Sequence, residues 1–495
     1  MSTTPASPAP ATVGRPPAPK GLVLAICCLS LLIVSLDATV VNVALPAIRR
    51  DLHAGVTGLQ WTIDGYTLTI ASFLLLAGST ADRIGRRRVF QTGLGVFGAA
   101  SLLCSLAPST SVLIAARVLQ GAGGSMLNPV AMSIITNTFT DRRERARAIG
   151  VWGAVVGVSQ AFGPLVGGYL TEHVGWRSIF WINVPIAVAA IVLTQLFVPE
   201  SRALRPRRLD PVGQVLVIAA LGSLVYALIE APGQGWGSPL ILTLLVVAAL
   251  AVAGLIVSAR TLAEPLIDVR FFRSVPFSSA SVTAVLGFGT YGSFLFVNAL
   301  YLQQLRGLSP FTTGIWMLPL AGCTLVASLN SGRMVSRFGT RPSLVIAGTL
   351  LAASGFSLTF LRADTPYALL LVSYVLLGLG FGTINAPITA TAVAGMPLAQ
   401  AGVAAGVASA SRQSGTAIGV ALAGTLTGTG AAAALGPSFA HDTHPLWWAV
   451  TGAGVLIALL GLAATTTWAK ATAERVRTRL DDAADPAPQT AVTPV

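Results

Sequence analysis

Three ionisable residues lie within long apolar runs of this sequence, where a charge is costly. Asp37 lies in the stretch LDATVVNVALP (residues 36–46), Asp64 lies in WTIDGY (residues 61–66), and Arg117 lies in a later run. A charged side chain at the centre of a membrane helix costs about 2.5 to 3.5 kcal/mol on insertion scales, so each of these residues requires a partner or a function. Counted from the expected outer ends of the runs at about 1.5 Å per residue, all three lie roughly 9 to 13 Å deep.

These three residues form a proton site if the folded chain brings them together. A neighbouring arginine favours the ionised form of a carboxyl group, whereas burial favours the neutral form, and this opposition makes the proton exchangeable. We therefore expect Asp37 to be the principal proton carrier, with Asp64 as a second titrating or substrate-facing acid and Arg117 as the modulating charge. The alternative is a fixed ion pair between Asp37 and Arg117 that only orients the helices. The four histidines fall outside the apolar runs, at His53, His173, His441 and His444.

Apolar runs of about 20 residues recur along the whole chain. Of its 495 residues, 54% are hydrophobic and only 10% are charged, and the mean hydropathy is +0.75, which is far from the averages for a soluble domain. Each run is long enough to cross a hydrocarbon core of about 30 Å. The sequence therefore predicts an all-α polytopic membrane protein with fourteen transmembrane helices, near residues 22–46, 58–80, 89–107, 111–135, 148–170, 178–198, 212–231, 239–259, 276–301, 310–332, 342–361, 366–394, 402–426 and 446–468.

The basic residues follow the alternation of the loops between these runs. The net charge of +13 alone would suit a nucleic-acid-binding protein, but an amino terminus in the cytosol places most of the 31 Lys and Arg residues on the cytosolic side, which is a topology signal. An even number of helices then returns the carboxyl terminus to the cytosol. The exceptions are Arg49, Arg50, Arg177, Arg306 and Arg362 in outer loops, and Arg117 and Arg412 within helices.

A short loop motif occurs twice in the chain. GSTADRIGRRR (residues 78–88) follows the second run, and GRMVSRFGTRP (residues 332–342) follows the tenth, with Gly85 aligned to Gly339. This repeat is typical of a transporter built from parallel halves, and its spacing leaves room for an inserted helix pair, giving a 6+2+6 arrangement. The predicted parts are a disordered cytosolic arm (1–20), an N-terminal six-helix bundle (21–200), linkers with the inserted pair (201–273), a C-terminal six-helix bundle (274–469) and a cytosolic tail (470–495).

The first copy of the loop has the composition of a gate. Asp82 stands among basic residues at a membrane edge, where a carboxylate can pair with an arginine in one conformation and release it in another. The alternative is that a short cytosolic loop collects Gly and Arg through turn chemistry and the positive-inside bias. The predicted gating residues are Gly78, Asp82, Arg83, Gly85, Arg86 and Arg87.

Three sequence motifs occur in the predicted N-terminal bundle, one in a loop and two in apolar runs. They comprise Gly78, Ala81, Asp82, Arg83, Gly85, Arg86 and Arg87 in the loop, Leu113, Arg117, Gln120 and Gly121 in the fourth run, and Gly163, Pro164, Gly167 and Gly168 in the fifth. With LDATVVNVALP and WTIDGY, they resemble the motifs of the major facilitator superfamily, in its fourteen-helix drug:proton antiporter branch. The resemblance covers nearly the whole chain. Thr80 departs from the usual leucine of the loop, and Ser159 departs from the first glycine of the antiporter motif.

The resemblance implies proton-coupled efflux of a hydrophobic or amphipathic drug or antibiotic across a bacterial plasma membrane. It also implies that the glycines around Pro164 serve the rocking of the two halves, although close helix packing alone would explain them. The rival interpretations are an importer of the same fold and an integral membrane enzyme. We expect protons as the coupling ion, no cofactor, no metal, no nucleic acid and no obligate protein partner, with the drug and the lipid bilayer as the interacting molecules.

Several polar residues in the membrane runs are candidates for substrate contact. Their alternative role is that of an interface anchor or of a helix–helix hydrogen bond. The C-terminal half carries Arg412 and no intramembrane acid, which favours a neutral, zwitterionic or weakly anionic substrate. The candidates are Tyr66, Tyr291, Asn298, Tyr301, Gln304 and Arg412.

Overall fold

The computed structural model describes residues 19–203, 208–262, 264–397, 400–427 and 438–484 as a helical protein. No strand occurs within these ranges. The helices are α1 (Lys20–Leu52), α2 (Val56–Ile84), α3 (Arg86–Ser105), α4 (Thr110–Thr138), α5 (Arg142–His173), α6 (Ser178–Trp181), α7 (Asn183–Phe197), α8 (Pro211–Gln234), α9 (Pro239–Thr261), η1 (Val269–Arg273), α10 (Val275–Leu300), η2 (Tyr301–Leu305), α11 (Pro310–Trp316), α12 (Leu318–Phe338), α13 (Thr340–Leu358), α14 (Tyr367–Val393), α15 (Ala401–Leu426), α16 (Phe439–Asp442), α17 (His444–Ala463) and α18 (Thr467–Ala484).

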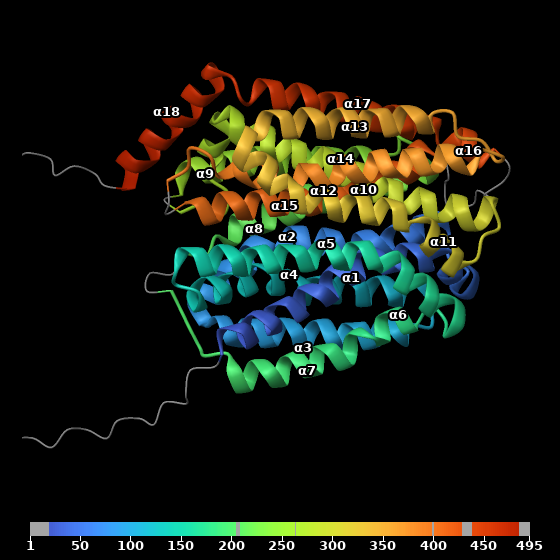
Figure 1. Ribbon diagram of the computed structural model, residues 1–495, viewed down its shortest axis with the longest axis horizontal. Helices are drawn as coiled ribbons and strands as arrows, with labels where there is room; N and C mark the ends of the chain where they lie inside the picture. Colours follow the sequence, from blue (N-terminus) through green and yellow to red (C-terminus); the bar gives the residue numbers. More distant parts are fainter. Residues whose placement is uncertain (1–18, 204–207, 263, 398–399, 428–437, 485–495) are drawn as a thin grey trace, which may run out of the picture.

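The helices form two bundles that lie side by side (Figure 1). Helices α1 to α7 make up one bundle, and α10 to α17 make up the other, with the long helices of both running in roughly the same direction (Figure 1). We call these the first and second bundles. The predicted boundaries of the six-helix bundles, at residues 21–200 and 274–469, stay predictions. Residues 1–18 of the predicted arm (1–20) and residues 485–495 of the predicted tail lie outside the described residues.

All fourteen predicted segments are helical, and three of them are interrupted. The sixth is broken at Ile182, the tenth at Met317, and the last between the end of α17 at Ala463 and the start of α18 at Thr467. Within the described ranges, ten helical stretches are long and apolar enough to cross a membrane by length and composition. The chain is therefore a multi-pass membrane protein, and the number of crossings and the side of each terminus stay predictions.

Of the inserted pair, α8 lies at the seam between the bundles and α9 packs against α8. Helix α8 packs against α2 of the first bundle and α15 of the second. Gln214 Nε2 donates to the Ser72 carbonyl at 2.8 Å, and Trp61 Nε1 donates to Glu230 Oε1 at 3.1 Å. Glu230 is partly buried there, since Trp61 of α2 donates to it.

The two copies of the repeated loop have the same backbone geometry. Gly85 is the single residue between α2 and α3, and Gly339 is the single residue between α12 and α13. Both have positive φ, +128° and +80°, a region that residues with a Cβ rarely adopt. Both copies of the motif therefore form a tight turn, and glycine is favoured in each because a single residue with positive φ joins two helices.

Hydrogen bonds join the two bundles near one end. Arg49 Nη1 donates to Gln304 Oε1 at 2.9 Å, Gln303 Nε2 donates to the Val43 carbonyl at 2.8 Å, and Glu172 accepts from the Phe311 amide at 2.8 Å. This end contains the carboxyl end of α1 and the amino end of α2, which is the outer side in the predicted topology. Among the described residues, no side-chain hydrogen bond joins the bundles at the opposite end, so the closure lies on the outer side.

Helix α18 was not predicted as an element. It extends from the end of α17 at an angle to the bundle (Figure 1). Val476 and Leu480 are buried, and Thr472 Oγ1 accepts a hydrogen bond of 3.0 Å from the Val275 amide at the start of α10. We predicted this segment only as a tail, yet its apolar residues recur at helical spacing and dock on the second bundle.

We predict that Gly339→Ala destabilises the protein. The added Cβ disfavours the left-handed backbone at this turn by about 1 to 2 kcal/mol. Thermal unfolding of the purified protein in detergent measures this change. Gly332→Ala is the matched control, since Gly332 lies within α12 with open space around it and alanine favours helix there. Equal stability of the two variants would contradict the prediction.

Candidate functional site

Asp37 and Arg117 form an ion pair in the interior of the first bundle. Both residues are 1% exposed. Arg117 Nη1 donates to Asp37 Oδ2, and Arg117 Nε donates to the Thr62 carbonyl at 2.9 Å. The pair therefore links α1, α2 and α4, and the predicted meeting of Asp37 and Arg117 is confirmed.

Two amide side chains complete the coordination of the Asp37 carboxylate. Gln120 Nε2 donates to Asp37 Oδ1 at 2.9 Å and to Ser101 Oγ at 2.8 Å, and Asn183 Nδ2 donates to Asp37 Oδ1 at 3.0 Å. Gln120 Oε1 in turn accepts from Arg117 Nη1 at 2.6 Å. We call Asp37, Arg117, Gln120, Asn183 and Ser101 the Asp37 network. It satisfies the carboxylate with three donors, as a buried charge requires.

The sequence pattern did not identify all members of this network. Gln120 stands one helical turn after Arg117, so the two side chains share a face of α4, and that spacing is a signal. Asn183 gave no such signal, because it reaches Asp37 only through the break at Ile182, after which α7 begins. The backbone break in the sixth segment thus has a structural role.

Two aromatic rings enclose the Arg117 guanidinium. Its carbon lies 4.2 Å from the centroid of the Tyr66 ring and 5.6 Å from that of Phe180. Rings at these distances stabilise a cation and exclude water. Tyr66 also donates its hydroxyl hydrogen to the Val34 carbonyl at 3.3 Å. Tyr66 therefore makes a helix–helix contact, the alternative role that we gave for it.

Asp64 lies outside the Asp37 network. It is fully buried in α2. Asp64 Oδ1 accepts a hydrogen bond of 3.3 Å from the Thr67 hydroxyl, whereas Oδ2 has no partner. No basic residue of the described chain forms an ion pair with it. The predicted three-residue cluster is thus divided into the Asp37–Arg117 ion pair and a separate acid, Asp64. The reason is that Tyr66, which lies beside Arg117, and Asp64 point from different faces of α2.

The predicted gating loop is held by a segment that follows α7. Asp82 Oδ1 of α2 pairs at 2.8 Å with Nη2 of Arg86, which begins α3 on the other side of the Gly85 turn. Glu200 Oε1 accepts from the Arg87 amide at 3.0 Å, and the Ala203 amide donates to the Asp82 carbonyl at 3.0 Å. Glu200 was not among the predicted residues, since it is distant in sequence. A Cβ at Gly85 would lie 2.7 Å from the Glu200 carboxyl carbon. The absence of a side chain at this position therefore leaves room for the Glu200 carboxylate.

The glycines of α5 contact both bundles. A Cβ at Gly167 would lie 2.7 Å from the Val40 carbonyl of α1, and one at Gly168 would lie 2.9 Å from Phe311 Cα of α11. The approach is equally close from the other side, since a Cβ at Gly314 of α11 would lie 2.5 Å from the Pro164 carbonyl oxygen of α5. Gly163 packs against Thr39. Small residues let helix backbones approach in a membrane, and here they form the contact between the bundles at the outer end.

Three of the remaining candidates for substrate contact bind other residues of the second bundle. Tyr291 stacks on Phe381 with centroids 3.9 Å apart. Asn298 accepts a hydrogen bond of 2.5 Å from the Tyr374 hydroxyl, and Tyr301 donates to the Arg362 carbonyl at 2.7 Å. These contacts hold the second bundle together.

The other two candidates, Gln304 and Arg412, are partly exposed. Gln304 accepts from Arg49 and lines an outer cavity of about 830 Å³ between α1 and η2. Arg412 is partly buried in the middle of α15, where Nη2 donates to Thr389 Oγ1 at 2.5 Å. Among the six candidates, these two are the partly exposed ones, and the other four are buried.

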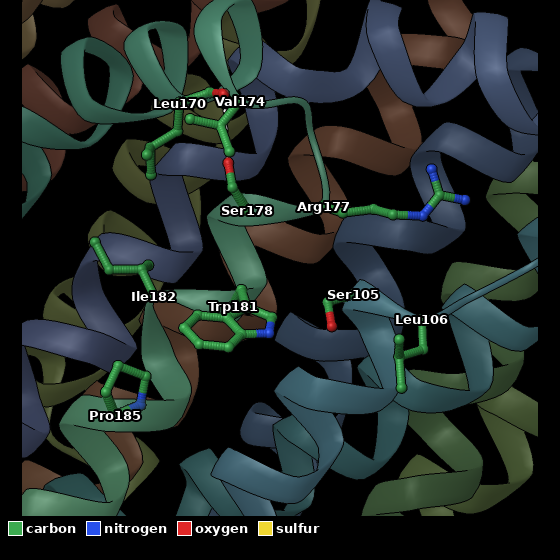
Figure 2. A pocket seen from close by; sticks show the side chains of 9 residues that line it. All are labelled: Ser105, Leu106, Leu170, Val174, Arg177, Ser178, Trp181, Ile182 and Pro185. Atoms are coloured by element: carbon green, nitrogen blue, oxygen red, sulfur yellow. Dashed lines mark hydrogen bonds between the residues drawn. The ribbon is translucent and has the colours of Figure 1, made fainter.

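A second hollow lies at the periphery of the first bundle. It has a volume of about 460 Å³, and its lining is almost wholly apolar, with Trp181 and Pro185 on one side and Leu106 on the other (Figure 2). Trp181 is 58% and Leu106 is 67% exposed, as expected for residues that face lipid. We assign this hollow to the lipid-facing surface. In the part of the chain that the structure describes, no three or more His, Cys, Asp or Glu side chains are grouped to hold a metal ion.

Two exposed acids lie at the outer end, beyond the expected membrane runs. The Ser309 hydroxyl and the Phe311 amide hold the pKa of Glu172 below its ordinary value, across the contact between α5 and α11. Arg177 and Trp176 likewise lower the pKa of Asp51, but all three of these residues belong to the first bundle. Of these two acids, only Glu172 therefore makes a contact between the bundles.

Comparisons with known proteins identify similar chains. The family model described as Major Facilitator Superfamily matches residues 27–420. The chain is 39% identical over 409 residues to the tetracenomycin C resistance and export protein of Streptomyces glaucescens, covering 82% of this chain and 75% of that one. It is 41% identical over 389 residues to the puromycin resistance protein of Streptomyces alboniger, covering 77% and 76%. A solved D-xylose–proton symporter has a similar fold, with a TM-score of 0.65, 14% identity and coverage of 89% and 97%.

We predict that Gly168→Leu separates the outer ends of α5 and α11. The new side chain would overlap the backbone of Pro310 and Phe311. Electron–electron resonance between spin labels at Val174 and Asp364, both exposed, measures the distance across this end, after replacement of the native cysteines. Gly153→Leu is the control, because Gly153 of the same helix has open space around it. An unchanged distance in Gly168→Leu would contradict the prediction.

We predict that acid weakens the outer contact through Glu172. Its pKa is lowered by partners in the closed form, so the contact is stabilised above the ordinary glutamate pKa of about 4.3 and this contribution is lost as the pH falls through the lowered value. The same labels should therefore show a longer distance only below about pH 4. Glu172→Ala should lengthen the distance at neutral pH, whereas Asp51→Asn should not. A neutral-pH distance that Glu172→Ala leaves unchanged would refute the role of this residue.

Proposed function

The chain belongs to the major facilitator superfamily, and from this premise we propose that it exports a hydrophobic or amphipathic drug or antibiotic in exchange for protons. The observation that carries the proposal is the identity of 39% to an antibiotic export protein over 82% of this chain. The relatives are bacterial, and the chain is a multi-pass protein of the bacterial plasma membrane. Transport rather than an enzymatic reaction is its activity in this proposal.

The two intramembrane acids have separate roles in this proposal. Asp37 accepts hydrogen bonds from three side chains, so protonating it would require Arg117 to leave and would cost much of the network. Asp64 has a free oxygen and no cation beside it, and an ionised carboxylate in such surroundings is costly. The geometry supports Asp64 as the acid that holds the exchanged proton, with the Asp37–Arg117 pair as the rigid frame around α2.

Alternating access follows from the position of the contacts between the bundles. The outer end is closed by side-chain hydrogen bonds and by glycine contacts between α5 and α11. Opening this end would require the bundles to pivot, and the Asp82 loop at the other end would then be rearranged. The closed outer end supports a state in which substrate enters from the cytosol.

Protons can supply the energy for uphill export. One elementary charge moved through 100 mV is worth about 2.3 kcal/mol, which corresponds to about a fiftyfold concentration ratio. Protons are thus the only coupling ion in the proposal, and the chain needs neither a cofactor nor an obligate protein partner. The lipid bilayer and the transported drug are the molecules with which it interacts.

We predict that Asp64→Asn abolishes proton-driven export but keeps exchange of substrate. Inverted vesicles with an acidified lumen should accumulate tetracenomycin C or puromycin with the unaltered protein. Asp64→Asn should lose this accumulation between about pH 6 and 8, the range in which a buried carboxyl can titrate. It should retain counterflow of labelled substrate, since counterflow needs the bundles to move but needs no net proton movement.

Asp37→Asn distinguishes the two acids. It leaves Arg117 without its counter-charge in the membrane, a change that costs about 3 to 5 kcal/mol in buried pairs, so both accumulation and counterflow should fall. If Asp37→Asn instead keeps counterflow and loses only accumulation, Asp37 is the proton carrier, as the sequence suggested. Gradient-independent accumulation by the unaltered protein would rule out proton coupling.

A further inference from the structure

The second bundle contains an arginine in the middle of α15, a helix that the sequence predicts to cross the membrane. Arg412 lies near the centre of α15. Its Nη2 donates to Thr389 Oγ1 at 2.5 Å and to the Asn385 carbonyl at 3.4 Å, and Nη1 donates to Ser409 Oγ at 3.4 Å. All of these acceptors are uncharged. The guanidinium is thus hydrogen-bonded by α14 and α15 without being neutralised.

Arg412 differs from Arg117, the other arginine within the predicted membrane helices, because it has no counter-charge in the part of the chain that the structure describes. Arg117 is neutralised by Asp37. None of the ion pairs among the described residues includes Arg412, and its Nε has no hydrogen-bond partner. An intramembrane cation without a counter-charge is costly and is commonly part of a substrate or ion pathway. Arg412 therefore has the capacity to bind one anion.

The packing of α15 against α2 gives the depth of this arginine. Gln60 near the outer end of α2 donates to the Val420 carbonyl at 2.9 Å, and Leu75 near the inner end lies against Gly406. Arg412 lies between these two contacts, which the predicted topology places near the middle of the membrane. The closed outer end of the bundles lies beyond Gln60, so a ligand would reach the arginine from the inner side.

Polar side chains around Arg412 mark a path to it. Asn385 and Gln413 are partly exposed, and Thr389 is exposed. These residues belong to the inner half of α14 and the middle of α15. Polar side chains exposed at this depth suit a water-filled cavity, because lipid tails offer no hydrogen bonds.

One aromatic ring adjoins the arginine. The Arg412 guanidinium carbon lies 5.8 Å from the centroid of Phe288 on α10. Phe288 is partly exposed. A cation that binds an anion and a ring that packs against an apolar group fit an amphipathic molecule with one negative charge.

We propose that Arg412 binds the anionic group, a carboxylate or an ionised phenol, of an amphipathic aromatic substrate. Two adjacent guanidinium nitrogens can donate to the two oxygens of a carboxylate, with Nε free for one of these bonds. The Thr389 and Ser409 hydroxyls would then turn to the ligand, and Phe288 would pack against its aromatic part. This inference rests on the proposed export function, whose substrate class it narrows.

Matched fluorescent probes test the proposal. Pyrenebutanoate, its methyl ester and pyrenebutylamine share a ring system and chain length, and differ in charge. Their binding to the purified full-length protein in nanodiscs of neutral lipid is measured by energy transfer from tryptophan. We expect the carboxylate to bind at least about tenfold more tightly than the other two probes, the size of effect that charged hydrogen bonds give.

Substitutions then assign the preference to Arg412. Arg412→Gln should weaken binding of the carboxylate about tenfold or more and leave the ester unchanged, while Arg412→Lys should retain part of the preference because it keeps the charge. Arg362→Gln removes the same charge from an exposed position outside the bundle and should have no effect. Retained folding is checked by the binding of the ester.

Three results would overturn the proposal. They are the lack of a carboxylate preference in the unaltered protein, an equal loss of acid and ester binding in Arg412→Gln, and an equal effect of Arg362→Gln. Vesicle accumulation of tetracenomycin C or puromycin is measured separately. Loss of gradient-driven accumulation with an intact carboxylate preference would refute the export function alone, whereas accumulation without the preference would refute the anion site alone.

Discussion

The ion pair between Asp37 and Arg117 determines how the helices of the first bundle meet. A single charge in a membrane is costly, and a bonded pair with satisfied hydrogen bonds reduces this cost. Donors from α4 and α7 therefore turn towards α1, and the Thr62 carbonyl of α2 accepts from Arg117. Because these helices are joined at one carboxylate, the first bundle is suited to move as a rigid body against the second.

Contacts between the bundles follow a different rule. Lipid gives no hydrophobic gain for bringing two membrane helices together, so close packing and hydrogen bonds must stabilise their contact. The outer end uses both, through glycines at Gly168 and Gly314 and through Glu172 on the Phe311 amide. The glycine contacts are buried and the Glu172 contact is exposed, and none of them includes a buried ion pair. A rigid bundle with weakly held ends is the arrangement that alternating access needs.

The sequence predicted the local features well and the side-chain directions poorly. Hydropathy located all fourteen helical segments, and the repeated Gly–Arg loop located the turns at Gly85 and Gly339. The depth of Asp37 and Arg117 predicted their pairing, but the same depth did not separate Asp64, because depth does not say which face of α2 a residue occupies. Asn183 and Glu200 depend on a helix break and on a returning segment, and sequence spacing carries no signal for such long-range contacts.

The positions of Asp64 and Arg412 constrain how a proton and an anion could be exchanged. They lie on α2 and α15, in different bundles, so a substrate on Arg412 does not displace the proton by occupying the same group. Exchange would then have to be coupled through the movement of the bundles. A monoanion leaving while a proton enters transfers two charges in the same electrical direction, worth about 4.6 kcal/mol per 100 mV. An anionic substrate would thus draw on the membrane potential twice as strongly as a neutral one.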